Sequence, residues 1–229
     1  MKQNIKNLAC AGAFLALGFS ALGDTIYDTS ASYNSNAFSL TSNQEIGNEI
    51  ILNSGIWSLT SFTLTYMSPS ATLSTDVSLK IRLYENDGVA YNGYSSPGTL
   101  IYDSDWYNTT LFGSLLANGT HTVTYTGADF PTTIILPADF TFSVTFKGLD
   151  GSNQVELPLA SNPTAGVSAT FGDYWFNSGS GWSLLTNSAA KNNLMVTVTA
   201  NEVPEPSLIY LGIAGTAMLL GARKLKRKA

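Results

Sequence analysis

The chain has 229 residues, 44% of them hydrophobic and 12% charged, and its net charge at pH 7 is −5. All 16 acidic residues but only four basic ones lie between residues 24 and 205, so this segment alone carries a charge of −12. Phosphate binding needs clustered Lys and Arg, so this balance argues against nucleic acid and favours a soluble, acidic exterior.

The first 23 residues have the layout of a secretory signal peptide. A lysine-containing start precedes the apolar run Leu8–Phe19, and small residues stand just before Asp24. We therefore expect residues 1–23 to be a signal helix that engages the Sec translocon and is removed by signal peptidase. Its removal takes away Cys10, the only cysteine, which excludes disulfides, thiolate metal ligands and a cysteine nucleophile from the mature chain.

Residues 24–203 have the pattern of β structure throughout. Apolar and polar residues alternate along four clear segments, and Gly-, Asn-, Asp- and Pro-containing turns separate them; the segments are Val77–Tyr84, Thr120–Thr126, Phe140–Lys147 and Leu194–Thr199. A period of two indicates one buried and one exposed face, as in antiparallel sheets. The pattern predicts one all-β domain over 24–203, an antiparallel two-sheet β-sandwich of jelly-roll-like type.

Two segments depart from simple alternation. In Trp57–Tyr66 the apolar phase changes near Thr60 and Ser61, which predicts a bulge or a crossing between sheets. The segment Leu157–Ser180 is rich in Pro and Gly, and we expect a long loop or sheet edge there with one or two short strands.

No catalytic residue is predicted, and we expect the protein not to be an enzyme. His121 is the only histidine, no Gly-x-Ser-x-Gly motif is present, and His121 shares its strand phase with Val123 and Tyr125, which favours a core position. Carboxylates suited to glycoside hydrolysis are present by residue type only, at Glu85, Asp87, Asp103, Asp105 and Glu156.

The only cofactor to consider is calcium. The carboxylates of Glu85, Asp87, Asp103 and Asp105 stand in two turn-like stretches and supply oxygen ligands of the kind calcium prefers. Neither stretch has the full EF-hand pattern, and ordinary turn chemistry is the simpler interpretation.

Aromatic residues near turn signals suggest a surface for sugar. Amphipathic rings gathered in loops form a platform on which a sugar ring can lie. The candidates are Trp106, Tyr107, Tyr174, Trp175 and Trp182. Core packing is the competing explanation for each of them.

The C-terminal residues 204–229 combine three features. Pro204, Glu205 and Pro206 precede an apolar stretch, residues 207–222, and a basic tail follows at 223–229 with cations at Arg223, Lys224, Lys226, Arg227 and Lys228. The stretch is short for a bilayer core of about 30 Å, but long basic side chains reach the interface and help to close the gap. We expect a single transmembrane helix with its basic end in the cytoplasm and the β domain outside.

Together, Val203-Pro-Glu-Pro206, the short Gly- and Ala-containing apolar run and the terminal Arg-Lys-Leu-Lys-Arg-Lys resemble the sorting signal of PEP-CTERM proteins. The resemblance implies export by a Gram-negative bacterium, transient anchoring in the inner membrane, and cleavage by an exosortase-type membrane protease. It also implies an association with exopolysaccharide and biofilm matrix. The stretches Val77–Gly88 and Ser96–Tyr102 are loosely similar to β-sandwich domains that precede interchangeable surface anchors (choice-of-anchor domains).

The expected function is that of an exported, non-enzymatic protein of the cell surface or biofilm matrix, with a structural or adhesive role linked to exopolysaccharide. The first alternative is a carbohydrate-binding module that uses the loop aromatics. A secreted polysaccharide hydrolase or lyase is the less favoured alternative.

Overall fold

The computed structural model describes residues 23–52, 55–107, 115–130, 132–168, 174–185 and 192–203. These residues form strands, turns and bends, and no helix occurs among them. The prediction of an all-β domain with antiparallel sheets is therefore confirmed, and the arrangement is consistent with the expected β-sandwich. The predicted signal helix and C-terminal helix lie outside the described residues.

The first large sheet is built around the long strand β4. Its eight strands are β1 (Asp24–Asp28), β2 (Tyr33–Ser39), β4 (Trp57–Ser68), β9 (Gly119–Thr126), β10 (Ile135–Leu136), β12 (Glu156–Ala160), β16 (Asn193–Leu194) and β17 (Val196–Glu202). Strands β17 and β9 both pair with Ser61–Leu64 of β4, so they flank it on opposite edges. We call this the β4 sheet.

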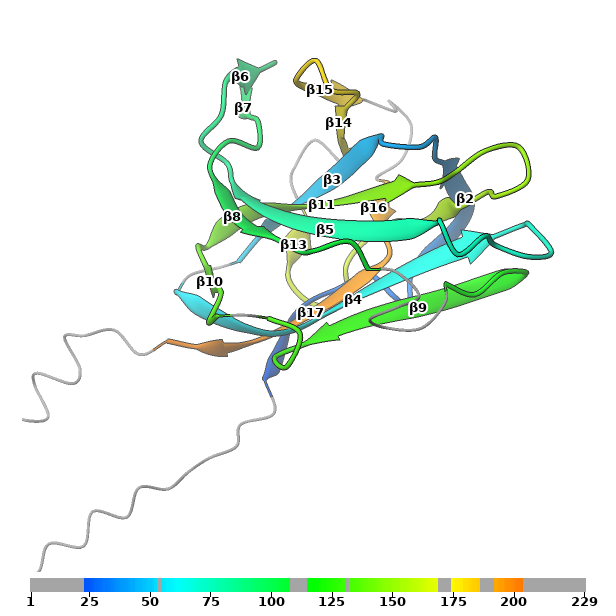
Figure 1. The fold of residues 1–229 in the computed structure, drawn as a ribbon. Helices are drawn as coiled ribbons and strands as arrows, with labels where there is room; N and C mark the ends of the chain where they lie inside the picture. The colour runs from blue at the N-terminus through cyan, green and yellow to red at the C-terminus, as the bar shows by residue number, and fades with distance from the viewer. Residues whose placement is uncertain are drawn as a thin grey trace, which may run out of the picture.

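The second large sheet is built around β11. In order it contains β15 (Trp182–Leu185), β14 (Tyr174–Asn177), β3 (Glu45–Ile51), β11 (Asp139–Lys147), β5 (Ser78–Glu85) and β8 (Leu100–Asp103), and β13 (Val167–Ser168) also pairs with β3. We call this the β11 sheet. A separate hairpin joins β6 (Ala90–Tyr91) to β7 (Tyr94–Ser95), and Figure 1 shows it rising from the end of the β11 sheet near β8.

The two sheets enclose one hydrophobic core. Phe62 of the β4 sheet meets Phe142 of the β11 sheet with ring centroids 5.3 Å apart, and Tyr66 lies 6.2 Å from Phe146. Along β11 the inward residues Phe140, Phe142, Val144 and Phe146 are fully buried, as the alternation predicted. Each such side chain contributes about 1.5–3 kcal/mol relative to leaving it exposed, so this stripe is a major source of stability.

The predicted irregularity in β4 is a β-bulge at Thr60. Thr199 of β17 pairs with Ser61, whereas the next residue, Ala200, pairs with Leu59, so Thr60 is left between them. The bulge returns Leu59 to the core side together with Phe62. The Thr60 hydroxyl lies 2.8 Å from the hydroxyl of Thr199, which gives the displaced residue a hydrogen-bond partner.

The expectation for Leu157–Ser180 was a long loop or sheet edge with one or two short strands; three short strands lie there, and the first of them, β12, is not at an edge. Strand β12 is largely buried and pairs with β2 on one edge and with β16 on the other. Pro158 is accommodated because its carbonyl accepts the Met195 N–H at 3.3 Å, while the pairing with β2 shifts between Pro158 and Ala160. The short strands β13 and β14 further along agree with the expectation.

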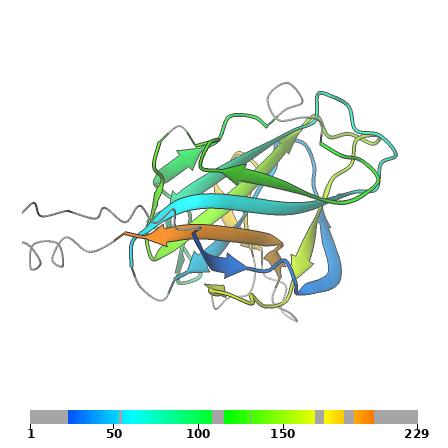
Figure 2. The ribbon, with the colours of Figure 1, turned by 90° about the horizontal axis from the view of Figure 1, so that it is seen from below.

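Both ends of the described body lie at the same end of the β4 sheet. Strands β1 and β17 are antiparallel, with Asp24 opposite Ala200, so the chain enters β1 where it leaves β17 (Figure 2). Loop 69–77 follows β4 and loop 148–155 follows β11, both at the end of the body away from these termini. We call them the far loops. They are tied together, since Ser74 N–H donates to Asn153 Oδ1 at 2.7 Å and Gln154 N–H to Ser70 Oγ at 2.9 Å.

Candidate functional site

The five aromatic residues predicted to bind sugar do not gather on one surface. Trp175 is fully buried in β14, opposite Gly47 of β3, so its prediction as a binding residue is corrected to a packing role. Gly47 provides room for close packing at this point, because a Cβ there would lie 2.7 Å from the Phe142 carbonyl oxygen. The sequence signal was misleading because the aromatic run is in a strand, not in a loop.

Three of the other four rings pack against separate partners. Trp182 meets Tyr84 edge-on at 5.6 Å, Tyr174 meets Phe38 at 5.2 Å, and Tyr107 lies 5.5 Å from Tyr125; these are all centroid distances. Tyr107 and Tyr174 also pack against the core. These contacts leave the rings partly exposed but do not bring them together into a platform.

Trp106 has a different environment. The Lys147 ammonium lies 4.5 Å from the centre of its ring, and the Lys80 ammonium lies 5.1 Å from it. Trp106 follows β8 at the end of the β11 sheet where β5 begins and β11 ends. The structure thus gives this residue cationic neighbours, which its position in a Ser-Asp-Trp-Tyr stretch did not reveal.

Two of the four carboxylates considered for calcium have hydrogen-bond or ion-pair partners of other kinds. Asp87 accepts both the N–H and the hydroxyl of Thr99 at 2.6 Å, and these bonds lower its pKa. Asp103 pairs with Lys80 at 2.9 Å and Arg82 at 2.8 Å. Partial burial acts to raise the pKa of Asp103, but these two cations hold it below its usual range. Glu85 and Asp105 are exposed, and no metal-binding group of three or more His, Cys, Asp or Glu residues occurs in the described ranges.

The most extensive polar cluster was not predicted, and it centres on Glu45. This carboxylate is 6% exposed and accepts hydrogen bonds from Ser143 Oγ at 2.6 Å, Tyr84 OH at 2.9 Å and Arg82 Nη1 at 3.1 Å. Ser143 is supplied by the adjacent strand β11, and Tyr84 and Arg82 by β5 on the far side of β11. Because the partners are between 37 and 98 residues away in the chain, no local pattern in the sequence could reveal them.

A second unpredicted pair joins Glu49 of β3 to Asp139 of β11. Burial, together with the charge and hydrogen bond of Asp139, raises the pKa of Glu49 to about 8. Asn86 connects the pair to the sheet, since its amide donates to Asp139 and its carbonyl accepts the Thr141 hydroxyl at 2.7 Å. At neutral pH the pair therefore tends to hold one proton between two carboxyl groups.

His121 occupies the core-side position that its strand phase predicted. Its ring centroid lies 5.6 Å from that of Tyr66, and its Nε2 is 3.0 Å from the Ala117 carbonyl oxygen. These contacts account for the residue without a catalytic role.

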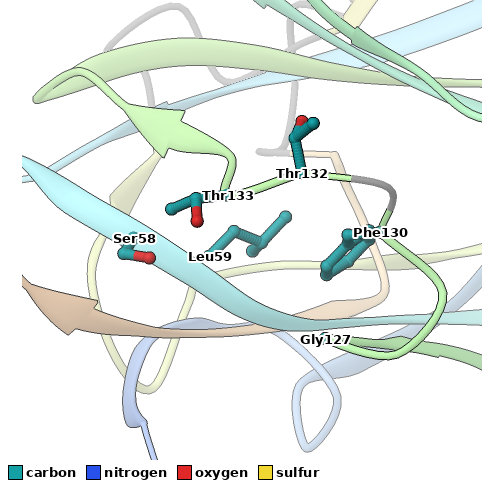
Figure 3. Close-up of a pocket in the computed structure, with 6 residues that line it drawn as sticks. All are labelled: Ser58, Leu59, Gly127, Phe130, Thr132 and Thr133. Carbon is teal, nitrogen blue, oxygen red and sulfur yellow. The ribbon is translucent and has the colours of Figure 1, made fainter.

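A pocket opens where the β4 sheet meets the turn between β9 and β10. It has a volume of about 340 Å³ and is lined by Ser58, Leu59, Gly127, Phe130, Thr132 and Thr133. Figure 3 shows Leu59 between Thr133 and Phe130, with Ser58 on the Thr133 side. The turn is held by Asp129, whose carboxylate accepts the Thr126 N–H at 2.7 Å and its hydroxyl at 2.9 Å.

The lining of this pocket suits a small, uncharged, hydroxylated ligand. Its side chains supply three hydroxyls, one aromatic ring and one aliphatic floor, and none of them is charged. The Phe130 ring is fixed by an edge-on contact with Tyr102 at 5.6 Å. The pocket was missed at the sequence level because its residues come from β4 and from the segment between β9 and β10, which are neighbours only in the fold.

Comparison of the chain with protein-family models, curated proteins and solved structures gave no match. In the described part of the chain, no helix is long and apolar enough to cross a membrane. The predicted sorting motif Pro204-Glu205-Pro206, the helix 207–222 and the basic flank Arg223–Lys228 all lie outside the described residues.

Proposed function

We propose that the chain is an exported, non-enzymatic protein of the bacterial surface or biofilm matrix, with a structural or adhesive role linked to exopolysaccharide. In this proposal residues 1–23 direct export, residues 24–203 form the working domain, and residues 204–229 anchor it in the inner membrane until an exosortase cleaves near Pro204-Glu205-Pro206. The released domain then stays at the outer surface or in the matrix.

The pairing of β1 with β17 is the observation that supports this proposal best. It places the start and the end of the domain side by side, so a membrane segment after Glu202 and a signal peptide before Asp24 attach at one end of the body. The far loops then point away from the membrane. An anchored domain with this geometry presents its opposite end to the matrix without obstruction by its own termini.

We propose a jelly-roll-like connection of the sandwich on the basis of its strand order. Strands β2, β3, β4 and β5 belong alternately to the β4 sheet and the β11 sheet, and β10, β11 and β12 again alternate. Such repeated crossing between two facing sheets is characteristic of jelly rolls and unlike a meander, in which neighbours in sequence pair within one sheet.

Mass spectrometry of the exported protein tests the sorting proposal. We expect a mature species that has lost residues 1–23 and the segment from Ser207 onward, and that is recovered with the polysaccharide fraction. A mature species that keeps Arg223–Lys228 would show a permanent membrane anchor instead. Recovery that is unchanged in a host unable to make the polysaccharide would contradict the link to it.

A carbohydrate-binding module is the second candidate, favoured by the pocket beside β4. Its volume of about 340 Å³ lies within the range of small-molecule sites, and hydroxyls with one ring are the groups that recognise neutral sugars. A glycan array with the exported protein and its Phe130→Ala variant tests this function. Binding that is lost in the variant supports it, and the absence of any glycan binding in the unmodified protein excludes it.

A further inference from the structure

The cations of the described residues are gathered in one place. Only three of these residues are basic, against 14 acidic ones, and the three are Lys80, Arg82 and Lys147. They lie on the adjacent strands β5 and β11, with Lys80 opposite Thr145 and Lys147 opposite Ser78. Nothing in the overall acidity of the chain requires this clustering, so it marks one distinctive region of an otherwise negative surface.

The cluster is not fully neutralised. Arg82 pairs with Glu45 and Asp103, and Lys80 also pairs with Asp103. Two cations therefore share two carboxylates, and among the described residues no ion pair involves Lys147. Lys147 thus places beside Trp106 an ammonium that the described ion pairs do not balance.

Trp106 holds two ammonium groups near each other. Since both lie within about 5 Å of the same ring centre, they are no more than about 10 Å apart, which is roughly one Debye length at 0.1 M salt. The π face of Trp attracts each cation and restrains its long side chain. The two cations still repel one another, and an anion placed beside both relieves that repulsion. Because the lysine side chains are already restrained, binding of such an anion costs less side-chain conformational entropy.

We propose that Lys80, Lys147 and Trp106 form a subsite for the carboxylate of an acidic sugar unit. This inference rests on the proposed function, and it names the chemistry that the domain recognises in a polysaccharide. The subsite lies next to the far loops, because Ser78 follows loop 69–77 and Lys147 precedes loop 148–155. It therefore faces the matrix when the chain is attached at the end that carries Glu202.

An uncharged glycan does not fit these observations as well. Neutral sugars are recognised by stacking on an open ring and by neutral donors and acceptors, whereas the groups nearest to Trp106 here are two ammoniums. A nucleic acid is disfavoured, because the described residues include 14 acidic side chains and only three basic ones. A uronate residue presents one carboxylate on a neutral ring, which matches a small positive site in an acidic surface.

Titration of the exported protein with tri-galacturonate tests the subsite, with neutral maltotriose as the comparison ligand. Binding is followed through the indole N–H signals in ¹H–¹⁵N NMR spectra, and the Trp106 signal is assigned from a Trp106→Phe variant. We expect tri-galacturonate alone to shift that signal, and Lys147→Gln to weaken its binding about tenfold through loss of a charge-assisted contact. Lys147→Arg should keep most of the affinity, because the positive charge remains.

Lys191→Gln is the matched control, since it removes the same charge from a residue outside the described ranges. It should leave tri-galacturonate binding within about twofold of the unmodified protein, because the proposed subsite does not include it. The subsite is wrong if Lys147→Gln binds as tightly as the unmodified protein, or if Lys191→Gln weakens binding equally. Association of the protein with host polysaccharide together with no effect of tri-galacturonate would overturn the subsite and leave the proposed function standing.

Discussion

The guanidinium of Arg82 lies 3.1 Å from the carboxylate of Glu45, a residue with only 8% of its side chain exposed. Glu45 sits at one end of β3 and Arg82 in β5, and β11 separates the two strands. The pair therefore spans three strands of the β11 sheet, and Ser143 of the central strand donates to the same carboxylate. This geometry makes the pair a link across the sheet.

Replacement of Arg82 by Met should destabilise the domain by about 2–3 kcal/mol. The change leaves the Glu45 carboxylate buried without its cation, and partial exposure of Arg82 reduces the cost below that of a fully buried pair. The double variant Arg82→Met, Glu45→Gln should recover much of the loss, because it removes the unpaired charge. Urea denaturation of the three proteins measures both effects. Additive losses in the double variant would contradict the coupling.

Stability should fall as the pH rises from about 4.5 to about 8 because of Glu49. The carboxyl has a pKa of about 8 in the folded protein but an ordinary pKa of about 4.3 when unfolded, so between these values the folded state holds an extra proton. The stabilising contribution is complete below the lower value and is lost as the pH passes the higher one. Glu49→Gln should therefore raise the melting temperature at pH 8 by a few degrees and leave it unchanged near pH 4.5.

The exposed Glu85 is the control for this pH dependence. Glu85→Gln removes the same charge from the exposed end of β5 and should change the melting temperature at pH 8 by less than Glu49→Gln does. Parallel melting curves for the unmodified protein and Glu49→Gln across the pH range would show that Glu49 is not the group responsible.

Gly148→Ala should destabilise the far loops by about 2 kcal/mol or more. Gly148 has a φ of 76°, which is unfavourable for other residues, and a Cβ there would lie 2.6 Å from the Asp76 carbonyl oxygen. Gly151 belongs to the same loop, but it has open space around it and no positive φ. Gly151→Ala should accordingly be close to neutral, and equal thermal stability of the two variants would contradict this assignment.

Trp175→Ala should cost about 3–5 kcal/mol, the usual loss for truncation of a buried aromatic residue. Trp182→Ala removes a partly exposed ring whose described aromatic partner is Tyr84, so its cost should be clearly smaller. Thermal unfolding compares the two variants. Equal losses would mean that the hairpin of β14 and β15 contributes as one unit, contrary to the burial of its residues.

The strand pattern could be predicted because it depends on local alternation. The inward stripe of β11 and the bulge at Thr60 could both be predicted, since each follows from the spacing of apolar residues along one strand. The buried, doubly paired position of β12 was missed because Pro158 is a poor strand residue on its own. Its place depends on Met195 and β2, which lie far away in the chain.

The candidate sites were much harder to predict than the strands. Trp106 was identified by its residue type, but its two lysine neighbours come from β5 and β11. Glu45 and Glu49 lie in a stretch whose sequence pattern indicates only a strand. Their hydrogen-bond and ion-pair partners are determined by the order of strands in the sheet. Residue type therefore suggested which side chains were candidates for a functional role, whereas the order and register of the strands determine what each of them contacts.

The antiparallel pairing of β17 has a mechanical consequence. Strand β17 is held along its length by β4 on one edge and β1 on the other. A tension applied at the far loops and resisted beyond Glu202 pulls this strand along its own axis. Its hydrogen bonds to both neighbours are then sheared together, instead of being opened one after another as in a peeled strand. In the proposed surface protein, strand β17 would thus carry load between the anchored end and the far loops.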